Sequence, residues 1–326
     1  TEEVYSLAAL QMKFESFCHP GMTEDERAEA LTDAMTVEEQ IGQLKYDAEA
    51  IPRLGIPAYN WWNEGLHGLA RAGTATMFPQ AIGMAAMFDP ELTERAASIT
   101  ADEARAKYNT VTQQHGDRDI YKGLTIWSPN INIFRDPRWG RGHETYGEDP
   151  YLTSRMGVMV VKGLQGPADG DYDKLHACAK HFAVHSGPEW NRHSFNAENI
   201  KPRDLYETYL PPFEALVKEG EVKEVMCAYN RFEGEPCCGS NRLLMHILRD
   251  EWGYKEIVVS DCWAISDFYN KGAHETDPDK QHASAKAVLS GTDIECGDSY
   301  GSLPEAVKEG LIDEKQISEA PDESPL

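Results

Sequence analysis

The chain has 326 residues and a formal net charge of −24 at pH 7. Such a charge disfavours nucleic acid and anionic membrane surfaces as partners, because both would be repelled over most of the protein surface. The apolar and aromatic content is ordinary for a globular protein, and no stretch approaches the roughly 20 consecutive apolar residues of a membrane-spanning helix. We therefore expect a soluble, folded chain whose easiest partner is a neutral ligand.

Seven cysteines are spread along the chain without any C-x-x-C pair. Their spacing disfavours both a structural zinc site and a thioredoxin-like redox centre. Cys237 and Cys238 are adjacent, while Cys262 and Cys296 each follow an acidic residue at a predicted strand end. The sequence therefore allows disulfides but does not assign their pairing.

The predicted organisation has three parts: an N-terminal extension over 1–35, one domain over 36–320 and an interrupted tail over 321–326. The first ten residues lack the basic-then-apolar pattern of a signal peptide, but the chain begins with Thr. A leader removed earlier is therefore compatible with the sequence, and the start of the chain does not establish a cytoplasmic home.

Apolar, strand-like runs alternate with helical patterns along most of the chain. Thr36, with Glu39 three residues later, forms a capping box that predicts a helix over 36–44. Apolar residues at helical spacing predict a second helix over 89–108. Further strands are predicted at 124–132, 176–182, 224–230, 256–263 and 291–295, and further helices at 149–164, 203–220, 241–253 and 302–311.

This alternation predicts an α/β fold with a parallel sheet, either closed into a barrel or open and doubly wound. Nearly every strand-like run ends in a polar cluster, such as NEGLHG, SPNIN, KHF, AYN or SDC. A barrel gathers its active site at the C-terminal ends of many strands, whereas an open sheet concentrates it at one switch point. We therefore predict a (β/α)8 TIM-like barrel with irregularities.

The most informative segment is the apolar run Ile257–Val259 followed by Ser260 and Asp261. A carboxylate that ends a buried strand stands at the mouth of a barrel and can act as a nucleophile. The alternative interpretation is that Asp261 caps the following helix through its backbone N–H groups.

This segment resembles the signature of glycoside hydrolase family 3. The resemblance spans the chain from about 36 to about 320, and several motifs recur in the family's order. It implies that Asp261 is the catalytic nucleophile, which attacks the anomeric carbon and forms a glycosyl-enzyme intermediate. One departure is Glu256, where the family usually has glycine.

Other motifs of the resemblance predict a ring of sugar-binding residues. Polar groups come from Arg141 in RWGRGHE, from Lys180 and His181 in AKHF, and from Tyr229 in CAYN. Flat apolar faces that suit a pyranose ring are predicted at Trp62, Trp127 and Trp263.

The loop 180–193 raises two further questions. His181 and His185 have the i, i+4 spacing that binds zinc on a helix, but the run is strand-like and no metal site is expected. The loop also resembles that of family members in which an Asp-x-His pair is the general acid/base. Asn191 replaces the aspartate, so His193 is a poor candidate for that role, and Arg192 and His193 are expected to contact sugar or to brace Asp261.

The substrate prediction depends on Glu64. The segment YNWWNEGLHG resembles the WWxEALHG of plant and fungal β-xylosidases, whereas β-glucosidases of the family usually carry an aspartate here. We expect the longer Glu64 side chain to fill the volume that the hydroxymethyl group of glucose would need. A β-glucosidase, an α-L-arabinofuranosidase and a non-catalytic carbohydrate-binding or scaffold domain remain as alternatives.

Retaining hydrolysis needs a second carboxyl group about 5 Å from the nucleophile, and the sequence offers no clear candidate. The resemblance implies that this acid/base is a glutamate in a C-terminal α/β domain, so the chain alone is expected to be a weak catalyst. Cations at Lys180 and at Arg141 or Arg192 are expected to keep Asp261 ionised. No cofactor is implied, and the resemblance suggests a periplasmic or secreted setting.

Overall fold

The computed structural model describes residues 19, 21–115, 120–170 and 172–319. The tail predicted at 321–326 lies outside these ranges, as do the first 18 residues of the predicted extension. The described part of that extension contains helix α2 (Glu24–Ala34), which begins with a capping box at Thr23.

A parallel sheet of four strands forms the centre of the molecule. Its strands are β3 (Thr125–Ile126), β4 (His176–Phe182), β6 (Glu224–Cys227) and β9 (Ile257–Ser260), and they neighbour one another in the order β3-β4-β6-β9. All residues of β3, β6 and β9 are buried. A parallel sheet covered on both faces buries its side chains on both sides, so its strands are rich in apolar residues. This apolar content is why these segments could be predicted as strands.

Backbone pairing continues beyond both edges of this sheet and closes an irregular barrel. At the β9 edge, Val259 bridges to Ile294 and the next residue, Glu295, bridges to Lys45. The chain then continues into β1 (Asp47–Ala48), which pairs antiparallel with β2 (Tyr59–Asn60).

The ring is completed where the segment after β2 meets β3. The N–H group of Trp127 donates to the carbonyl oxygen of Asn63 (3.0 Å), and the Thr125 hydroxyl donates to the carbonyl oxygen of Trp61 (2.6 Å). The predicted strand at 291–295 is therefore present only as single bridges.

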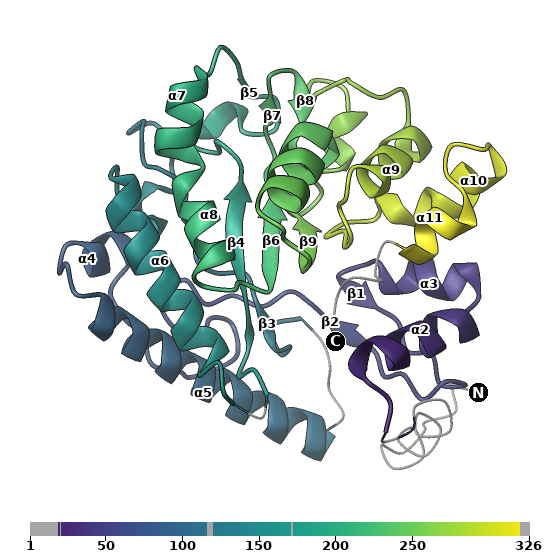
Figure 1. Cartoon of the computed structure of the whole chain (residues 1–326), viewed down its shortest axis with the longest axis horizontal. Helices are drawn as coiled ribbons and strands as arrows, with labels where there is room; N and C mark the ends of the chain where they lie inside the picture. Colours follow the sequence, from purple (N-terminus) through teal and green to yellow (C-terminus); the bar gives the residue numbers. More distant parts are fainter. Residues whose placement is uncertain (1–18, 20, 116–119, 171, 320–326) are drawn as a thin grey trace.

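Helices cover the outside of the barrel. In Figure 1, α6 (Pro150–Gln165) and α8 (Pro211–Lys218) lie to the left of β4 and β6, and α5 (Pro90–His115) runs below these strands. Close contact between α5 and α6 is possible because α6 places Gly163 against the α5 backbone. The other α-helices are α3 (Val37–Gln43), α4 (Ala81–Ala85), α7 (Pro202–Asp204), α9 (Lys280–Leu289), α10 (Leu303–Lys308) and α11 (Glu314–Glu319).

Short elements occupy the connections between these helices and strands. A small sheet is formed by β5 (Asn196–Ala197), β7 (Arg231–Phe232) and β8 (Glu235–Pro236). The 3₁₀ turns are η1 (Gly142–Glu144), η2 (Glu189–Asn191), η4 (Cys237–Gly239), η6 (Ser266–Phe268) and η7 (Ser299–Ser302). Two segments, η3 (Leu205–Tyr209) and η5 (Arg242–Glu251), are wider π-helices.

Several sequence predictions can be compared directly with these elements. The capping box of Thr36 and Glu39 is confirmed, with the Glu39 N–H group donating to the Thr36 hydroxyl. The helix predicted over 203–220 is divided into α7, η3 and α8. Pro211 and Pro212 carry no N–H donor, so a single uninterrupted α-helical ladder cannot run through them.

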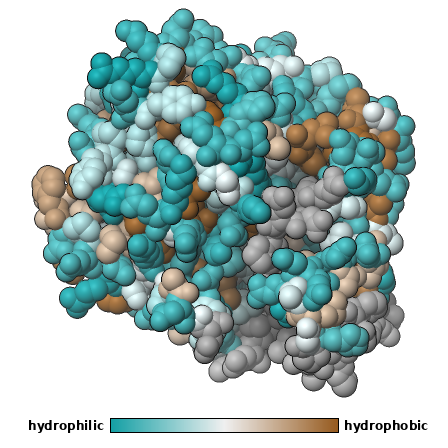
Figure 2. All heavy atoms as spheres, in the orientation of Figure 1, coloured by the Kyte–Doolittle hydropathy of each residue, from teal (hydrophilic) through white to brown (hydrophobic). Residues whose placement is uncertain are grey.

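The surface of the molecule is mostly polar. Figure 2 shows a face that is mainly hydrophilic, with hydrophobic residues gathered in a few places. Among the described residues no helix is long and apolar enough to cross a membrane. One disulfide, which the sequence could not assign, joins Cys227 at the end of β6 to Cys238 in η4.

Candidate active site

Asp261 directly follows β9 and lies at the C-terminal end of the barrel strands. Its N–H group donates to the carbonyl oxygen of Cys227 on β6 (3.1 Å), which continues the strand pairing up to the carboxylate. Its Oδ1 accepts from the N–H group of Cys262 (2.8 Å), and the residue is 7% exposed. Among the described residues, Oδ2 has no hydrogen-bond partner.

These contacts argue against a helix-capping role for Asp261. A capping side chain accepts from the second or third N–H group of the following helix, whereas Asp261 accepts from its immediate neighbour Cys262. The carboxylate is therefore fixed through Oδ1, and Oδ2 is left for another group.

Charges around Asp261 act on its pKa in opposite directions. Burial raises this pKa above its usual value, and the Arg141 guanidinium and the Lys180 ammonium oppose that rise. The expectation that nearby cations assist ionisation is right in sign for these two residues, but burial outweighs them. Arg192 acts on the neighbouring Tyr229 and His181 instead.

His181 is held so that its Nε2 lies 3.7 Å from Asp261 Oδ2. Asn132 Oδ1 accepts from the His181 backbone N–H group (2.8 Å) and lies 2.9 Å from Nδ1, while Asn132 Nδ2 donates to the His181 carbonyl oxygen (2.8 Å). These backbone contacts fix the Asn132 amide, so Nδ1 carries the imidazole proton. Burial lowers the pKa of His181, and its neutral Nε2 is therefore an acceptor.

Two acceptors, His181 Nε2 and Asp261 Oδ2, thus face the same small space. Hydroxyl groups of a ligand can satisfy both acceptors, because each hydroxyl can donate a hydrogen bond to an acceptor and accept one from a nearby cation. The arrangement suits a polyhydroxylated ligand.

Arg141 was predicted to offer its guanidinium fork to a sugar, but the structure pairs most of that fork with Glu144. Nε and Nη2 of Arg141 both donate to Glu144, at 3.0 and 2.7 Å. Burial alone would raise the pKa of Glu144, but Arg141 holds it below its usual value. Within the described part of the chain, Arg141 Nη1 makes no hydrogen bond, and it is the nitrogen left for a ligand.

Glu64 lies between an aromatic group and a cation. Its Oε1 accepts from Trp62 Nε1 (2.9 Å), and its Oε2 lies 3.9 Å from Lys180 Nζ. Trp62 in turn stacks on Trp127, with ring centroids 5.5 Å apart. Trp127 is only 1% exposed, so it supports Trp62 from below and does not itself offer a face to a sugar, contrary to the sequence prediction.

Arg192 and His193 were predicted to contact sugar or brace Asp261, and the structure places them around Tyr229. The Arg192 guanidinium lies 5.4 Å from the Tyr229 ring centre, and the His193 ring lies 4.6 Å from it. Burial and the charge of Asp261 raise the pKa of Tyr229. Tyr229 therefore keeps its proton and can donate a hydrogen bond from beside Asp261.

His193 is held by a carboxylate that the sequence did not reveal. Its Nδ1 lies 2.8 Å from Asp267 Oδ2, and its Nε2 accepts from Arg192 Nε (3.1 Å). Asp267 thus supplies the charge that Asn191 cannot. Both ring nitrogens are occupied, so His193 remains a bracing residue and a poor acid/base.

Trp263 is the exposed aromatic residue of the site. It is 46% exposed and has a backbone φ of 60°, a left-handed conformation that is rare for a bulky side chain. Its N–H group donates to the carbonyl oxygen of Cys296 (2.5 Å). This contact holds the turn that follows Asp261.

The possible zinc pair does not form a metal site. His181 and His185 have ring centroids 4.9 Å apart, but His185 Nδ1 bonds to Asn230 Oδ1 at 3.0 Å. Within the described residues no group of three His, Cys, Asp or Glu side chains could hold a metal ion.

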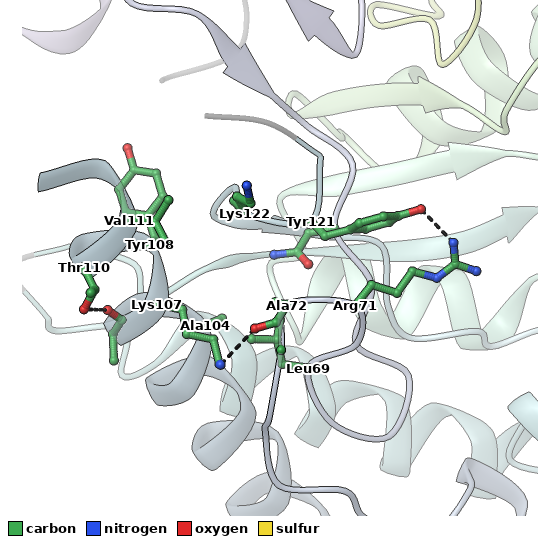
Figure 3. A pocket seen from close by; sticks show the side chains of 13 residues that line it. Leu69, Arg71, Ala72, Ala104, Lys107, Tyr108, Thr110, Val111, Tyr121 and Lys122 are labelled. Atoms are coloured by element: carbon green, nitrogen blue, oxygen red, sulfur yellow. Dashed lines mark hydrogen bonds between the residues drawn. The ribbon is translucent and has the colours of Figure 1, made fainter. Parts of the chain in front are cut away.

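A separate cavity of about 430 Å³ is lined by Asn63 and Tyr121 among others, and Asp261 is not one of its lining residues. Tyr121 connects the two places, because its N–H group donates to the Trp62 carbonyl oxygen (2.8 Å). In the cavity wall, Arg71 donates to the Tyr121 hydroxyl (2.8 Å) and Lys107 to the Ala72 carbonyl oxygen (2.9 Å) (Figure 3).

Comparison with known proteins places this geometry in context. The family model "Glycosyl hydrolase family 3 N terminal domain" matches residues 23–322. The chain is 54% identical over 302 residues to a xylan 1,4-beta-xylosidase of Xylanibacter ruminicola, which covers 92% of the chain and 35% of that protein. It is 41% identical over 320 residues to beta-xylosidase/alpha-L-arabinofuranosidase 1 of Medicago sativa subsp. varia, which covers 93% of the chain and 40% of that protein.

Solved structures show the same relationship. A GH3 exo-beta-xylosidase in complex with a xylobiose aziridine activity-based probe has a TM-score of 0.86 and 33% identity, covering 98% of this chain and 41% of that one. A GH3 beta-glucosidase of Bifidobacterium adolescentis has a TM-score of 0.71 and 29% identity, and the match covers 90% of this chain and 39% of that one. The predicted barrel fold is confirmed, and the chain spans 35% to 41% of the length of these four proteins.

Proposed function

This chain belongs to glycosyl hydrolase family 3, and from that membership we propose that it supplies the nucleophile and the sugar-binding residues of a retaining, exo-acting β-xylosidase. The substrate is a terminal β-D-xylosyl residue of a xyloside or xylo-oligosaccharide. Asp261 attacks the anomeric carbon, and a glycosyl-enzyme intermediate forms on its carboxylate.

The single observation that carries this proposal is the state of the Asp261 carboxylate. Oδ1 is held by the N–H group of Cys262, whereas Oδ2 has no hydrogen-bond partner in the described part of the chain and faces His181 Nε2. A nucleophile needs this combination of a fixed orientation and one uncommitted oxygen.

Several groups are poised to hold the sugar around that oxygen. His181 offers an acceptor, Tyr229 a protonated hydroxyl and Arg141 one uncommitted nitrogen, while Glu64 and Lys180 form the opposite wall. Relatives described as xylosidases support xylose as the sugar, and Glu64 is proposed to occupy the space of the hydroxymethyl group that xylose lacks.

The acid/base is proposed to be a glutamate of a C-terminal α/β domain of the same enzyme. Carboxylates close to the nucleophile are already committed, since Glu144 pairs with Arg141, Asp267 with His193, and Glu64 with Trp62. None of these is positioned as a free acid. The relatives extend well beyond the matched region, which leaves length for such a domain.

Two alternatives are distinguished by substrate and by turnover. One relative is described as both a β-xylosidase and an α-L-arabinofuranosidase, so a panel of xyloside, glucoside and arabinofuranoside tests the sugar. A purely carbohydrate-binding role would bind these sugars without cleaving any of them, also in the extended enzyme.

The decisive experiment is covalent labelling of the extended enzyme with a 2-deoxy-2-fluoro-xyloside that carries a good leaving group. The mass of the fluoroxylosyl group is expected on the peptide containing Asp261, and Asp261→Asn is expected to abolish both labelling and turnover. Asp298→Asn, which changes a largely exposed carboxylate, is the matched control. Labelling of another carboxylate would refute the assignment.

A periplasmic or secreted location is part of the proposal. The disulfide between Cys227 and Cys238 supports it, because disulfides persist mainly in oxidising compartments.

A further inference from the structure

Two cysteines meet beside the proposed nucleophile. Cys262 directly follows Asp261, and Cys296 lies 34 residues later in the segment that pairs with β9. Their Sγ atoms are 2.6 Å apart. Cys262 is half-buried and Cys296 is buried, so Cys262 is the more exposed residue of the pair.

The backbone holds the two residues in register. The N–H group of Cys296 donates to the Ser260 hydroxyl (3.0 Å), and the N–H group of Trp263 donates to the Cys296 carbonyl oxygen (2.5 Å). These bonds flank the sulfur pair on both sides. A covalent bond requires the sulfurs to approach by only about a further 0.5 Å.

The other free cysteines of the described chain are differently placed. Cys178 and Cys237 are both buried, and Cys237 bonds to the carbonyl oxygen of Ala183 (3.6 Å). Neither has a second sulfur at a comparable distance within the described residues. The arrangement at Cys262 is therefore specific to the nucleophile turn.

We propose that Cys262 and Cys296 are a redox modification site that closes as a second disulfide next to Asp261. A small-molecule disulfide is the oxidant. Its sulfur–sulfur bond breaks and is reduced to two thiols, which take the two thiol protons, while the bond between Cys262 and Cys296 forms. The half-buried Cys262 is the sulfur that the oxidant reaches first.

Closure fixes the donor that orients the nucleophile. The N–H group of Cys262 holds Asp261 Oδ1 at 2.8 Å, so a covalent bond from Cys262 to the neighbouring segment anchors that donor. Closure also removes an alkylatable thiol from the immediate surroundings of Asp261. Only this second consequence rests on the proposed glycosidase function.

The first experiment maps the bond directly and needs no enzymatic activity. The protein is incubated with oxidised glutathione or with dithiothreitol, quenched in acid with N-ethylmaleimide, and mapped by mass spectrometry. A linked Cys262–Cys296 peptide is expected after oxidation, and two alkylated cysteines are expected after mild reduction that leaves Cys227–Cys238 intact. Two free thiols, or glutathione retained on Cys262 after oxidation, would overturn the proposal.

The second experiment compares thermal unfolding of the oxidised and mildly reduced forms. Closing a loop of this length is expected to raise Tm by roughly 5 to 10 °C. Cys262→Ser is expected to abolish the difference, while Cys178→Ser retains it even if that variant is less stable overall. A redox shift that survives in Cys262→Ser would contradict the assignment.

The third experiment links the bond to the site in the extended enzyme. Iodoacetamide is expected to slow fluoroxyloside labelling of Asp261 at least tenfold in the reduced form, and prior oxidation is expected to protect labelling. If iodoacetamide lowers the rate of labelling equally in the reduced and the oxidised form, the disulfide does not protect the surroundings of Asp261. If labelling fails in every sample while the mapped disulfide forms, the glycosidase assignment fails and the redox site stands.

Discussion

Glu64 makes two contacts that fix its carboxylate, as a residue that distinguishes xylose from the larger glucose would require. Its carboxylate accepts from Trp62 Nε1 and faces Lys180, so the side chain is held extended into the site. Glu64→Asp withdraws the carboxylate by one methylene. We expect the kcat/KM ratio of nitrophenyl xyloside to nitrophenyl glucoside, measured in the extended enzyme, to fall by about tenfold, the scale at which a pocket distinguishes one carbon.

Glu144→Asp is the matched control for that measurement. It shortens another carboxylate of the same site, but one that is committed to Arg141. The kcat/KM values for the xyloside and the glucoside are expected to fall by similar factors, so that their ratio stays unchanged. An unchanged ratio in Glu64→Asp as well would remove Glu64 as the selector.

Glu224 is a buried carboxyl group that the proposed mechanism does not use. It is 0% exposed at the start of β6, and among the described residues neither of its oxygens has a hydrogen-bond partner. Burial raises its pKa from 4.5 to about 8. Between these two values the folded protein binds a proton that the unfolded chain has lost, so stability falls as pH rises, by about 1.4 kcal/mol per pH unit.

Glu224→Gln is expected to remove that part of the pH dependence. The difference in unfolding free energy between pH 5 and pH 8, measured by denaturant titration, should shrink by about 3 to 4 kcal/mol. Glu305→Gln alters an exposed carboxylate on α10 and should leave the pH dependence as it is. If the unfolding free energy of the Glu224 variant and of the original chain changes equally between pH 5 and pH 8, Glu224 is ionised in the folded protein over that range.

The sequence predicts which residues lie at the ends of strands, but it does not predict the side chains that orient them. Asp261 and Lys180 were predictable because each comes at the end of a segment with an apolar run, Ile257–Val259 and Ala177–Ala179, and His181 comes directly after Lys180. Asn132 lies in SPNIN, a polar cluster at a predicted strand end. Its role in orienting His181 could not be predicted from that position. Asp267 meets His193 across 74 residues, and no local pattern encodes such a contact.

At the level of elements, the close approach of α5 and α6 depends on one glycine. A Cβ atom at Gly163 would lie 2.4 Å from the Glu94 carbonyl oxygen and 2.7 Å from Ala97 Cβ. Gly163→Ala is therefore expected to destabilise the fold by about 1 to 3 kcal/mol, because the clash with the α5 backbone outweighs the better helix propensity of alanine. Thermal or urea unfolding measures the change.

Gly42→Ala provides the same substitution without the clash. Gly42 lies in α3, where an added Cβ meets nothing within 4 Å, so the variant is expected to be neutral or more stable by up to about 1 kcal/mol. If the two variants are equally stable, the packing of α5 on α6 does not require the glycine.

The elements themselves were predicted where local chemistry decides their form. Thr36 and Glu39 satisfy each other's backbone groups regardless of the rest of the fold, and the runs Ala177–Ala179 of β4 and Ile257–Val259 of β9 are apolar. The π-helical form of Arg242–Glu251 was not predictable, because it is still a periodic helix in sequence. Trp127 failed as a sugar platform for a similar reason: burial is decided by the surrounding barrel and not by the residue type.

For the whole molecule, the proposed division of chemistry leads to a separate prediction. If Asp261 is the nucleophile and the acid lies in another domain, this chain alone lacks only the group that protonates the leaving oxygen. A leaving group that departs as a stable anion does not need that proton. The 326-residue chain is therefore expected to release dinitrophenolate from 2,4-dinitrophenyl β-xyloside in a burst of at most one equivalent, while nitrophenyl xyloside is cleaved at least 100-fold more slowly.

The step after the burst needs the same missing residue, which then acts as the base that activates water. Azide attacks without such activation, so adding it is expected to convert the burst into continuous release and to yield xylosyl azide. Asp261→Asn should eliminate both phases, whereas Asp298→Asn should retain them. Turnover of unactivated xylosides by this chain at the rate of the extended enzyme would place the acid/base within residues 1–326 and would require Glu64, Glu144 or Asp267 to leave its present partner.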